Sequence, residues 1–192
     1  MARIERTVMS NYAPLPASGI SATWRNLVDG SLCSVALRWE NEGWTADGRV
    51  ESNDVQFVLR ISSMWQVQQF LLFRDLEEPD LWLATDQRGR WGEVNGAHRT
   101  DLDGCVDVDL AGTPFTNSIP IRRLPLHVSH SAQQNVIRID TDTLSVVPVA
   151  QTYSMIGDST WRYRSMLTGD EVTASVDRYG LVVDDTTFER VD

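Results

Sequence analysis

Two aspartates and two arginines near the middle of the chain are the residues best suited to chemistry. Asp107 and Asp109 alternate with three apolar residues, Val106, Val108 and Leu110. Alternation with a period of two predicts a half-buried β-strand, which puts both carboxylates on one face, about 7 Å apart. Two carboxylates at such a separation could serve as the acid and the base of an inverting glycosidase.

The same aspartates have a structural interpretation, because Arg122 and Arg123 follow them in equal number. Bidentate Asp–Arg pairing would fix this segment as a buried charge network and could leave one arginine to meet a ligand. Catalytic carboxylates seldom lie two apart on one strand, so we favour the network. If it is buried, Asp107→Ala or Arg122→Ala should lower stability by roughly 3–5 kcal/mol. No metal site is predicted, because no further acidic cluster has ligand spacing.

The segment between these charges, residues 113–120, is expected to be an ordered crossing loop. Pro114 and Pro120 cannot donate to a β-ladder, which argues against a central strand. We expect Arg122 and Arg123 to point to opposite sides of an extended element that follows the loop. Three polar side chains of the loop could bind either its own backbone or a sugar or headgroup, and the sequence favours neither: Thr113, Thr116 and Asn117.

The elements that must position these residues are short β-strands separated by Gly, Asp-Gly and Pro. Strands are predicted over residues 22–27, 32–40, 55–61, 81–85, 89–94, 136–141, 144–150, 161–167, 172–176 and 181–183, and a strand is favoured over a helix for residues 65–73. A turn is expected at Asp47-Gly48, and Pro148 indicates an edge or irregular position. No amphipathic helix is evident. The pattern predicts an all-β single domain, and composition does not separate a sandwich from a barrel or a roll.

Length and composition are those of an ordinary globular protein. The chain has 192 residues, 42% of them hydrophobic and 23% charged, enough for one domain with a sizeable core. We expect a tail over residues 1–21 and one domain over residues 22–192. The net charge of −10 argues against a nucleic-acid or anionic-membrane partner. All 17 basic residues are arginines, whose planar donors suit carboxylate or phosphate.

The sequence predicts a cytoplasmic protein that needs no cofactor. The first ten residues lack the apolar core of a signal peptide, and no apolar run reaches membrane-spanning length. Cys33 and Cys105 are expected to be reduced thiols rather than a disulfide. Acidic neighbours would raise the pKa of Cys105, so we expect a core residue there rather than a nucleophile. The three histidines are expected at the surface: His98, His127 and His130.

The run from Leu102 to Leu126 closely resembles the signature of the putative glycolipid-binding family of bacterial proteins. It contains Gly-Cys, Asp-x-Asp, Thr-Pro-Phe-Thr-Asn and Pro-Ile-Arg-Arg-Leu in that order. Weaker similarity covers Trp24 and residues 46–50, 89–91, 151–153 and 179–183. The chain departs from the pattern at residues 62–66 and 185–186. The resemblance implies a spiral β-roll, in which one long antiparallel sheet curves strongly around its own core, and the binding of a glycolipid or another amphiphile.

Seven tryptophans are many for a chain of this length. Aromatic faces stack on sugar rings and line apolar cavities, but a curved sheet also needs large side chains to fill its concave side. We expect most of the seven to be core residues. Trp65, in the stretch that departs from the family pattern, and Trp91, just after a glycine turn, are the candidates for a ligand pocket.

Three functions are consistent with these residues. We favour a non-enzymatic protein that holds a glycolipid or other amphiphile on a curved sheet, with the arginines and Thr116–Asn117 near its polar end. The second is a hydrolase of glycosyl or acyl conjugates that uses Asp107 or Asp109. The third is a protein-interaction module without a small ligand. A cavity lined by Trp favours the first, an unpaired carboxylate the second, and an exposed apolar patch the third.

Overall fold

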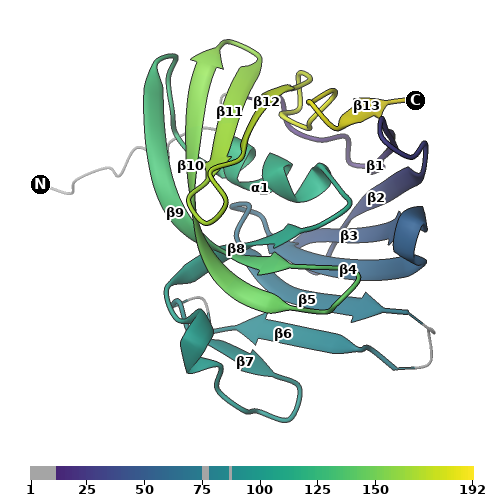
Figure 1. The fold of residues 1–192 in the computed structure, drawn as a ribbon, viewed down its shortest axis with the longest axis vertical. Helices are drawn as coiled ribbons and strands as arrows, with labels where there is room; N and C mark the ends of the chain where they lie inside the picture. The colour runs from purple at the N-terminus through teal and green to yellow at the C-terminus, as the bar shows by residue number, and fades with distance from the viewer. Residues whose placement is uncertain (1–11, 75–77, 87) are drawn as a thin grey trace, which may run out of the picture.

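The computed structural model describes residues 12–74, 78–86 and 88–192 (Figure 1). Its strands are β1 (Ile20–Asn26), β2 (Leu32–Glu40), β3 (Gly43–Val50), β4 (Val55–Ser62), β5 (Val67–Phe73), β6 (Leu81–Thr85), β7 (Trp91–Glu93), β8 (Cys105–Leu110), β9 (His130–Ile139), β10 (Val146–Gly157), β11 (Thr160–Ser165), β12 (Glu171–Ser175) and β13 (Phe188–Arg190). One α-helix, α1 (Phe115–Arg123), and two 3-10 turns, Glu51–Asn53 and Thr100–Leu102, complete the described part. The predicted all-β class is confirmed.

The strands form two sheets that curve around α1 (Figure 1). Sheet A has eight antiparallel strands in the order β13-β1-β2-β3-β4-β5-β6-β7. Sheet B has five, in the order β12-β11-β10-β9-β8. Antiparallel pairing stops at the β8–β9 pair, which is parallel because the chain crosses through α1 between the two strands. The spiral course of the roll stays a prediction.

The predicted crossing loop at residues 113–120 is wrong, because the chain forms α1 there. Pro114 takes the N-cap position with φ −77° and ψ −12°, and the fixed φ of proline suits the start of a helix. Pro120 lies inside the helix, where it removes one backbone donor. Arg122 and Arg123 therefore stand about 100° apart around a helix axis rather than on opposite sides of an extended segment.

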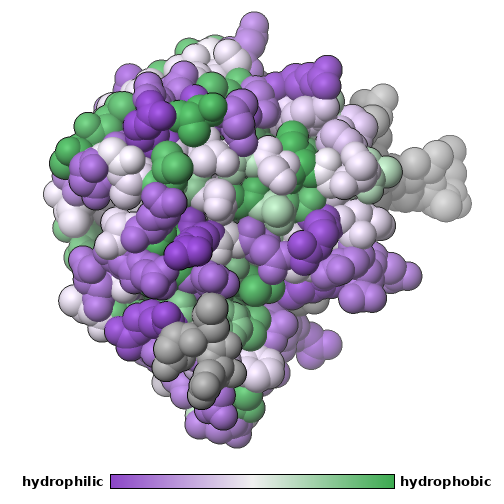
Figure 2. Space-filling model, turned by 90° about the vertical axis from the view of Figure 1, so that its right-hand side faces the viewer, coloured by the Kyte–Doolittle hydropathy of each residue, from purple (hydrophilic) through white to green (hydrophobic). Residues whose placement is uncertain are grey.

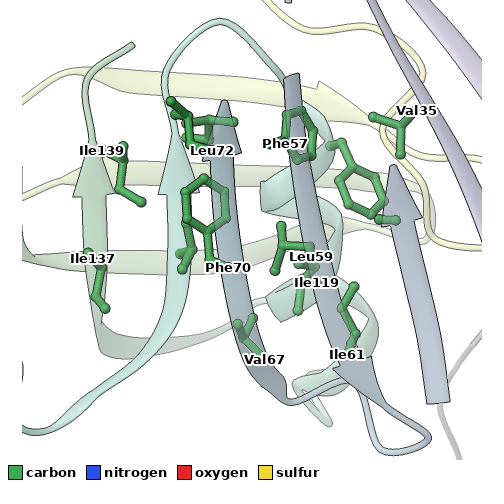
Figure 3. Packing of buried hydrophobic residues seen from close by; sticks show 14 of the residues in the cluster. Val35, Phe57, Leu59, Ile61, Val67, Phe70, Leu72, Ile119, Ile137 and Ile139 are labelled. Atoms are coloured by element: carbon green, nitrogen blue, oxygen red, sulfur yellow. The ribbon is translucent and has the colours of Figure 1, made fainter. Parts of the chain in front are cut away.

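Helix α1 is buried between the sheets and separates two apolar clusters. Phe115 and Ile119 belong to the larger cluster, on the concave side of sheet A. Ile121 belongs to the smaller one, with Tyr153 and Trp161 of sheet B. Figure 3 shows side chains of β4 and β5 pointing toward those of α1 and β9. Most of the space inside the curved sheets is thus filled by side chains.

One glycine position differs from the sequence expectation, and one proline position agrees with it. Asp47-Gly48 lies inside β3 and is not a turn. A Cβ at Gly48 would come within 2.1 Å of the Phe57 ring, so glycine is needed there for close packing. Pro148 lies in β10 opposite Ile137, before the part of β10 that pairs with β11, so the strand is locally an edge there, as expected. No hydrogen bond to β11 is therefore required of it.

Most predicted strands overlap an observed one, but three predictions are wrong in part. β9 begins at His130 and not at residue 136, β10 runs on to Gly157 and not to residue 150, and residues 181–183 form only an isolated bridge rather than a strand. Strand β1 begins at Ile20, and Leu15 ahead of it is buried in the larger cluster. Residues 1–11 of the predicted tail, and Gln87 between the strands predicted over residues 81–85 and 89–94, lie outside the described residues. The domain boundary at residue 22 stays a prediction. Across the described ranges, no helix is long and apolar enough to cross a membrane.

Candidate functional site

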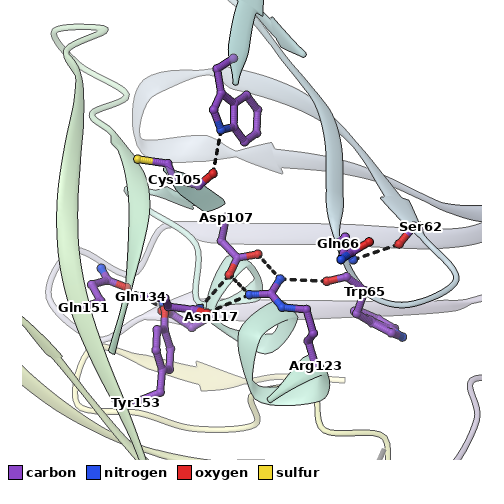
Figure 4. Close-up of polar contacts among 11 residues, drawn as sticks. Ser62, Trp65, Gln66, Cys105, Asp107, Asn117, Arg123, Gln134, Gln151 and Tyr153 are labelled. Carbon is purple, nitrogen blue, oxygen red and sulfur yellow. Dashed lines mark hydrogen bonds and ion pairs between the residues drawn. The ribbon is translucent and has the colours of Figure 1, made fainter. Parts of the chain in front are cut away.

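Asp107 and Arg123 form a buried ion pair between β8 and the end of α1 (Figure 4). Nη1 and Nη2 of Arg123 donate to Oδ1 and Oδ2 of Asp107 at 2.6 Å and 2.5 Å. Gln134 on β9 accepts from Nη2 at 2.9 Å and donates to Oδ2 at 2.8 Å. Although burial disfavours the charged guanidinium, the hydrogen bonds and charge of Asp107 raise the pKa of Arg123. One predicted carboxylate is therefore fully paired.

Asp109 has a different partner from the predicted one. Arg138, directly opposite it on β9, donates to Oδ2 at 2.8 Å, and Gln151 donates to the same oxygen at 2.6 Å. The Tyr153 hydroxyl lies 2.7 Å from Oε1 of Gln151 and 3.0 Å from Oδ1 of Asn117, and donates to one of them at a time. Burial, with Asp109 nearby, raises the pKa of Tyr153 well above its ordinary value. The network joins β8, β9 and β10 of sheet B to α1.

The expected pairing of Arg122 with an aspartate is wrong. Within the described ranges, no carboxylate reaches salt-bridge distance of Arg122, which is 6% exposed. Its guanidinium carbon lies 4.2 Å from the centroid of the Trp65 ring, and Nη2 donates a long hydrogen bond of 3.4 Å to the Ala13 carbonyl. Burial lowers the pKa of Arg122 to about 10. Helix geometry separates the two arginines and gives them different surroundings.

The threonine and asparagine side chains mainly hold α1 in place. Thr113 accepts a hydrogen bond from the backbone N–H of Phe115, and Thr116 accepts one from that of Leu110, each at 3.2 Å. Asn117 faces Tyr153 as described above. All three are buried. Of the two interpretations that the sequence left open, these contacts support the structural one.

A cleft of about 230 Å³ opens beside the Asp107–Arg123 pair. Its walls come from the start of β5, the β6–β7 hairpin, β8, α1 and β9, and are formed by Gln66, Val67, Thr85, Gly89, Trp91, Cys105, Val106, Arg123 and Gln134. Trp91 and Arg123 are the predicted site residues that line it. The other seven do not: Asp107, Asp109, Thr113, Thr116, Asn117, Arg122 and Trp65.

The chemistry of the cleft is polar without net charge. Arg123 contributes a guanidinium that Asp107 already neutralises. Gln66 is exposed and Gln134 half-buried, so their carboxamides offer both donors and acceptors. Trp91, held by a 2.9 Å hydrogen bond from Nε1 to the Cys105 carbonyl, adds an aromatic wall. This combination suits a neutral group rich in hydroxyls.

The thiols and histidines offer little further chemistry. Cys33 and Cys105 are free and buried, and burial, then the charges of Asp101 and Asp103, raises the pKa of Cys105 to about 11. The three histidines are exposed as predicted, and His98 contacts Asp103 at 2.8 Å. In the part of the chain that the structure describes, no three His, Cys, Asp or Glu residues are grouped as metal ligands would be.

Sequence reasoning missed the glutamines and Arg138. Gln66 precedes β5 and Gln134 lies within β9, and neither has a spacing that distinguishes it from solvated positions. Arg138 alternates with apolar residues on β9, and the period of two shows that it shares a face with Gln134. Pairing with Asp109 depends on the parallel β8–β9 register, which no local pattern reveals.

Two comparisons with known proteins find similarity over most of the chain. The family described as "Putative glycolipid-binding" matches residues 21–190. The chain is also similar to a DUF1089 family protein from Pseudomonas aeruginosa, whose crystal structure superposes with a TM-score of 0.67 at 26% identity. That similarity covers 94% of this chain and 97% of the other. No curated protein matches the chain.

Proposed function

Because the chain belongs to the putative glycolipid-binding family, we propose that it binds the sugar of an amphiphilic glycoconjugate in the cleft between the sheets. The observation that carries the proposal is the pairing of Arg123 with Asp107, which leaves a polar cleft without net charge. Sugar hydroxyls both donate and accept, as do the carboxamides of Gln66 and Gln134. Trp91 and Val67 supply apolar surface for the less polar face of a sugar ring.

The size of the cleft limits what enters it. Pockets for drug-sized ligands usually measure about 300–1,000 Å³, whereas this cleft measures about 230 Å³. It therefore suits one or two rings, and the apolar part of the ligand stays outside. Val106, 42% exposed in the cleft wall, and Met64, 57% exposed in the turn before Gln66, offer apolar surface close by.

The buried state of the aspartates supports binding rather than hydrolysis. A general acid or base must reach the reacting atoms. Both oxygens of Asp107 accept hydrogen bonds from Arg123, and Asp109 is held by Arg138 and Gln151. Neither carboxylate lines the cleft.

On the face seen in Figure 2, apolar residues are interrupted by polar ones, which gives little support to a protein-docking surface there. The free thiols favour a reducing compartment such as the cytoplasm.

The test is native mass spectrometry of the protein purified from its own host, followed by organic extraction and lipid analysis. We expect a co-purifying glycoconjugate in near-stoichiometric amount. Gln66→Ala should lower its occupancy, and Gln133→Ala, next to Gln134 but on the opposite face of β9, should not. Recovery of an amphiphile without a sugar, or equal occupancy in both variants, would contradict the proposal.

A further inference from the structure

Arg122 stands out among the arginines whose side chains are largely covered. The others that are at most 25% exposed each have a carboxylate within 3.2 Å: Arg60, Arg99, Arg123 and Arg190. Arg122 has no such partner among the described residues, and its Nε and Nη1 atoms are buried without a hydrogen bond. Buried donors normally have partners, because an unsatisfied charged group is costly. An unpaired buried guanidinium therefore indicates a role other than stability.

The surroundings of Arg122 hold the guanidinium but give two of its nitrogens no acceptor. The Trp65 ring covers one face at 4.2 Å. The stem is packed tightly, since a Cβ at Gly180 would lie 3.0 Å from Cγ of Arg122. All the N–H groups of a guanidinium lie in its plane, so an acceptor can approach from the edge while the face stays stacked. Asp177 acts on Arg122 only at longer range, and its own ion pair is with Arg190 at 2.8 Å.

We propose that Arg122 and Trp65 form a second binding site, which takes an oxyanion, either a carboxylate or a phosphate group. An oxyanion supplies the acceptors that Nε and Nη1 lack and neutralises the buried charge. The long Nη2 bond to the Ala13 carbonyl is the weakest contact around the guanidinium. Because both unpaired nitrogens are shielded from solvent, binding requires a small displacement of the groups that cover them.

This site is separate from the cleft but adjoins it through Trp65. The Trp65 carbonyl accepts a hydrogen bond from Arg123 at 3.1 Å, while its ring lies against Arg122. Trp65 has φ +60°, a left-handed conformation that is costly for a bulky residue, so contacts on both sides must hold it. The proposal for Arg122 does not rest on sugar binding, since a free oxyanion can occupy the site.

The test follows the Arg Nε–Hε signals by NMR during titration with sodium phosphate and, separately, sodium acetate, at constant ionic strength set by chloride. We expect a saturable shift of the Arg122 signal with one of the anions and no comparable shift with chloride. Arg122→Lys, which lacks the Nε–H group, identifies the signal. If this variant does not fold, nuclear Overhauser contacts with the Trp65 ring identify it in the wild type.

A thermal shift measurement supplies the matched comparison. The stronger anion should raise the Tm of wild type and of Arg164→Gln, which changes an exposed arginine on β11. Loss of the Arg122 charge in Arg122→Gln should weaken binding about ten-fold or more. An Arg122 signal that does not move, or that moves only as much as those of exposed arginines, would overturn the proposal. An alkyl glycoside that binds without moving the Arg122 signal would support sugar binding in the cleft and would give no support to the site at Arg122.

Discussion

Asp107 and Arg123 meet through two parallel hydrogen bonds of 2.6 Å and 2.5 Å, with the carboxylate 1% exposed and the guanidinium side chain 18% exposed at the edge of a cleft. Geometry of this kind fixes the end of α1 against β8 and removes the charge of Arg123 from the cleft. The pair therefore links the stability of the fold to the kind of ligand that the cleft can accept.

Asp107→Asn should destabilise the protein strongly. The substitution keeps the shape of the side chain but leaves Arg123 without its counter-charge, and breaking a buried pair costs about 3–5 kcal/mol. Chemical denaturation measures the free energy of unfolding. The control is Arg162→Gln, which removes an exposed pair with Glu171 and should cost less than about 1 kcal/mol. Equal losses in both variants would show that the buried pair is not a structural anchor.

Arg122→Met, unlike Asp107→Asn, should not lower the free energy of unfolding strongly. The sequence-based expectation of a loss of roughly 3–5 kcal/mol assumed a carboxylate partner, which Arg122 lacks among the described residues. Replacing an unpaired buried charge by an apolar side chain of similar length should leave the free energy of unfolding within about 1 kcal/mol of wild type, or raise it. A loss as large as that of Asp107→Asn would mean that Arg122 has a charged partner after all.

Gly48→Ala should destabilise through crowding. The new Cβ would come within 2.1 Å of the buried Phe57 ring, and overpacking of this kind costs about 1–3 kcal/mol. In a double-mutant cycle, Phe57→Leu should make room for the methyl group, so the double variant should lose less than the sum of the two single changes. Additive losses would mean that the ring is not what requires glycine.

Many of the strands could be predicted from sequence because apolar and polar residues alternate along a half-buried strand. In β4 the buried apolar residues are Val55, Phe57, Leu59 and Ile61. Helix α1 could not, because it is buried on every side and its polar residues are inside. Thr116, Asn117 and Arg122 are covered since each contacts a group far away in the sequence or on another element. Without an exposed face there is no helical period to detect.

Only the part of the candidate site that lies in one stretch of sequence could be predicted. The dense polar motif predicted that an aspartate pairs with an arginine, as Asp107 does with Arg123, since charges at fixed spacing are visible in one stretch of sequence. The cleft beside them is assembled from strands that are remote in sequence and includes Gln66 and Gln134. Such residues become neighbours only once the two sheets have closed around α1.

Both thiols should resist alkylation in the folded protein. Burial raises the pKa of Cys33 to about 12 and that of Cys105 to about 11, so little thiolate forms at pH 8. Since the folded state holds these protons more tightly than the unfolded state, stability should fall as pH rises from about 9 toward 11. Iodoacetamide labelling, followed by mass spectrometry with and without urea, checks the first point. Fast labelling without denaturant would contradict it.

The central claim is that the neutral cleft holds a sugar, and isothermal titration calorimetry with an alkyl glucoside below its critical micelle concentration tests it most directly. We predict saturable binding to wild type and to Gln133→Ala, and affinity lowered about ten-fold by Gln66→Ala, as expected for the loss of one or two hydrogen bonds. An alkyl phosphate with the same chain should bind more weakly than the glucoside to Arg122→Gln, which lacks the proposed oxyanion site. Identical affinity of the glucoside for wild type, Gln133→Ala and Gln66→Ala, or no preference of Arg122→Gln for the glucoside over the phosphate, would contradict the account.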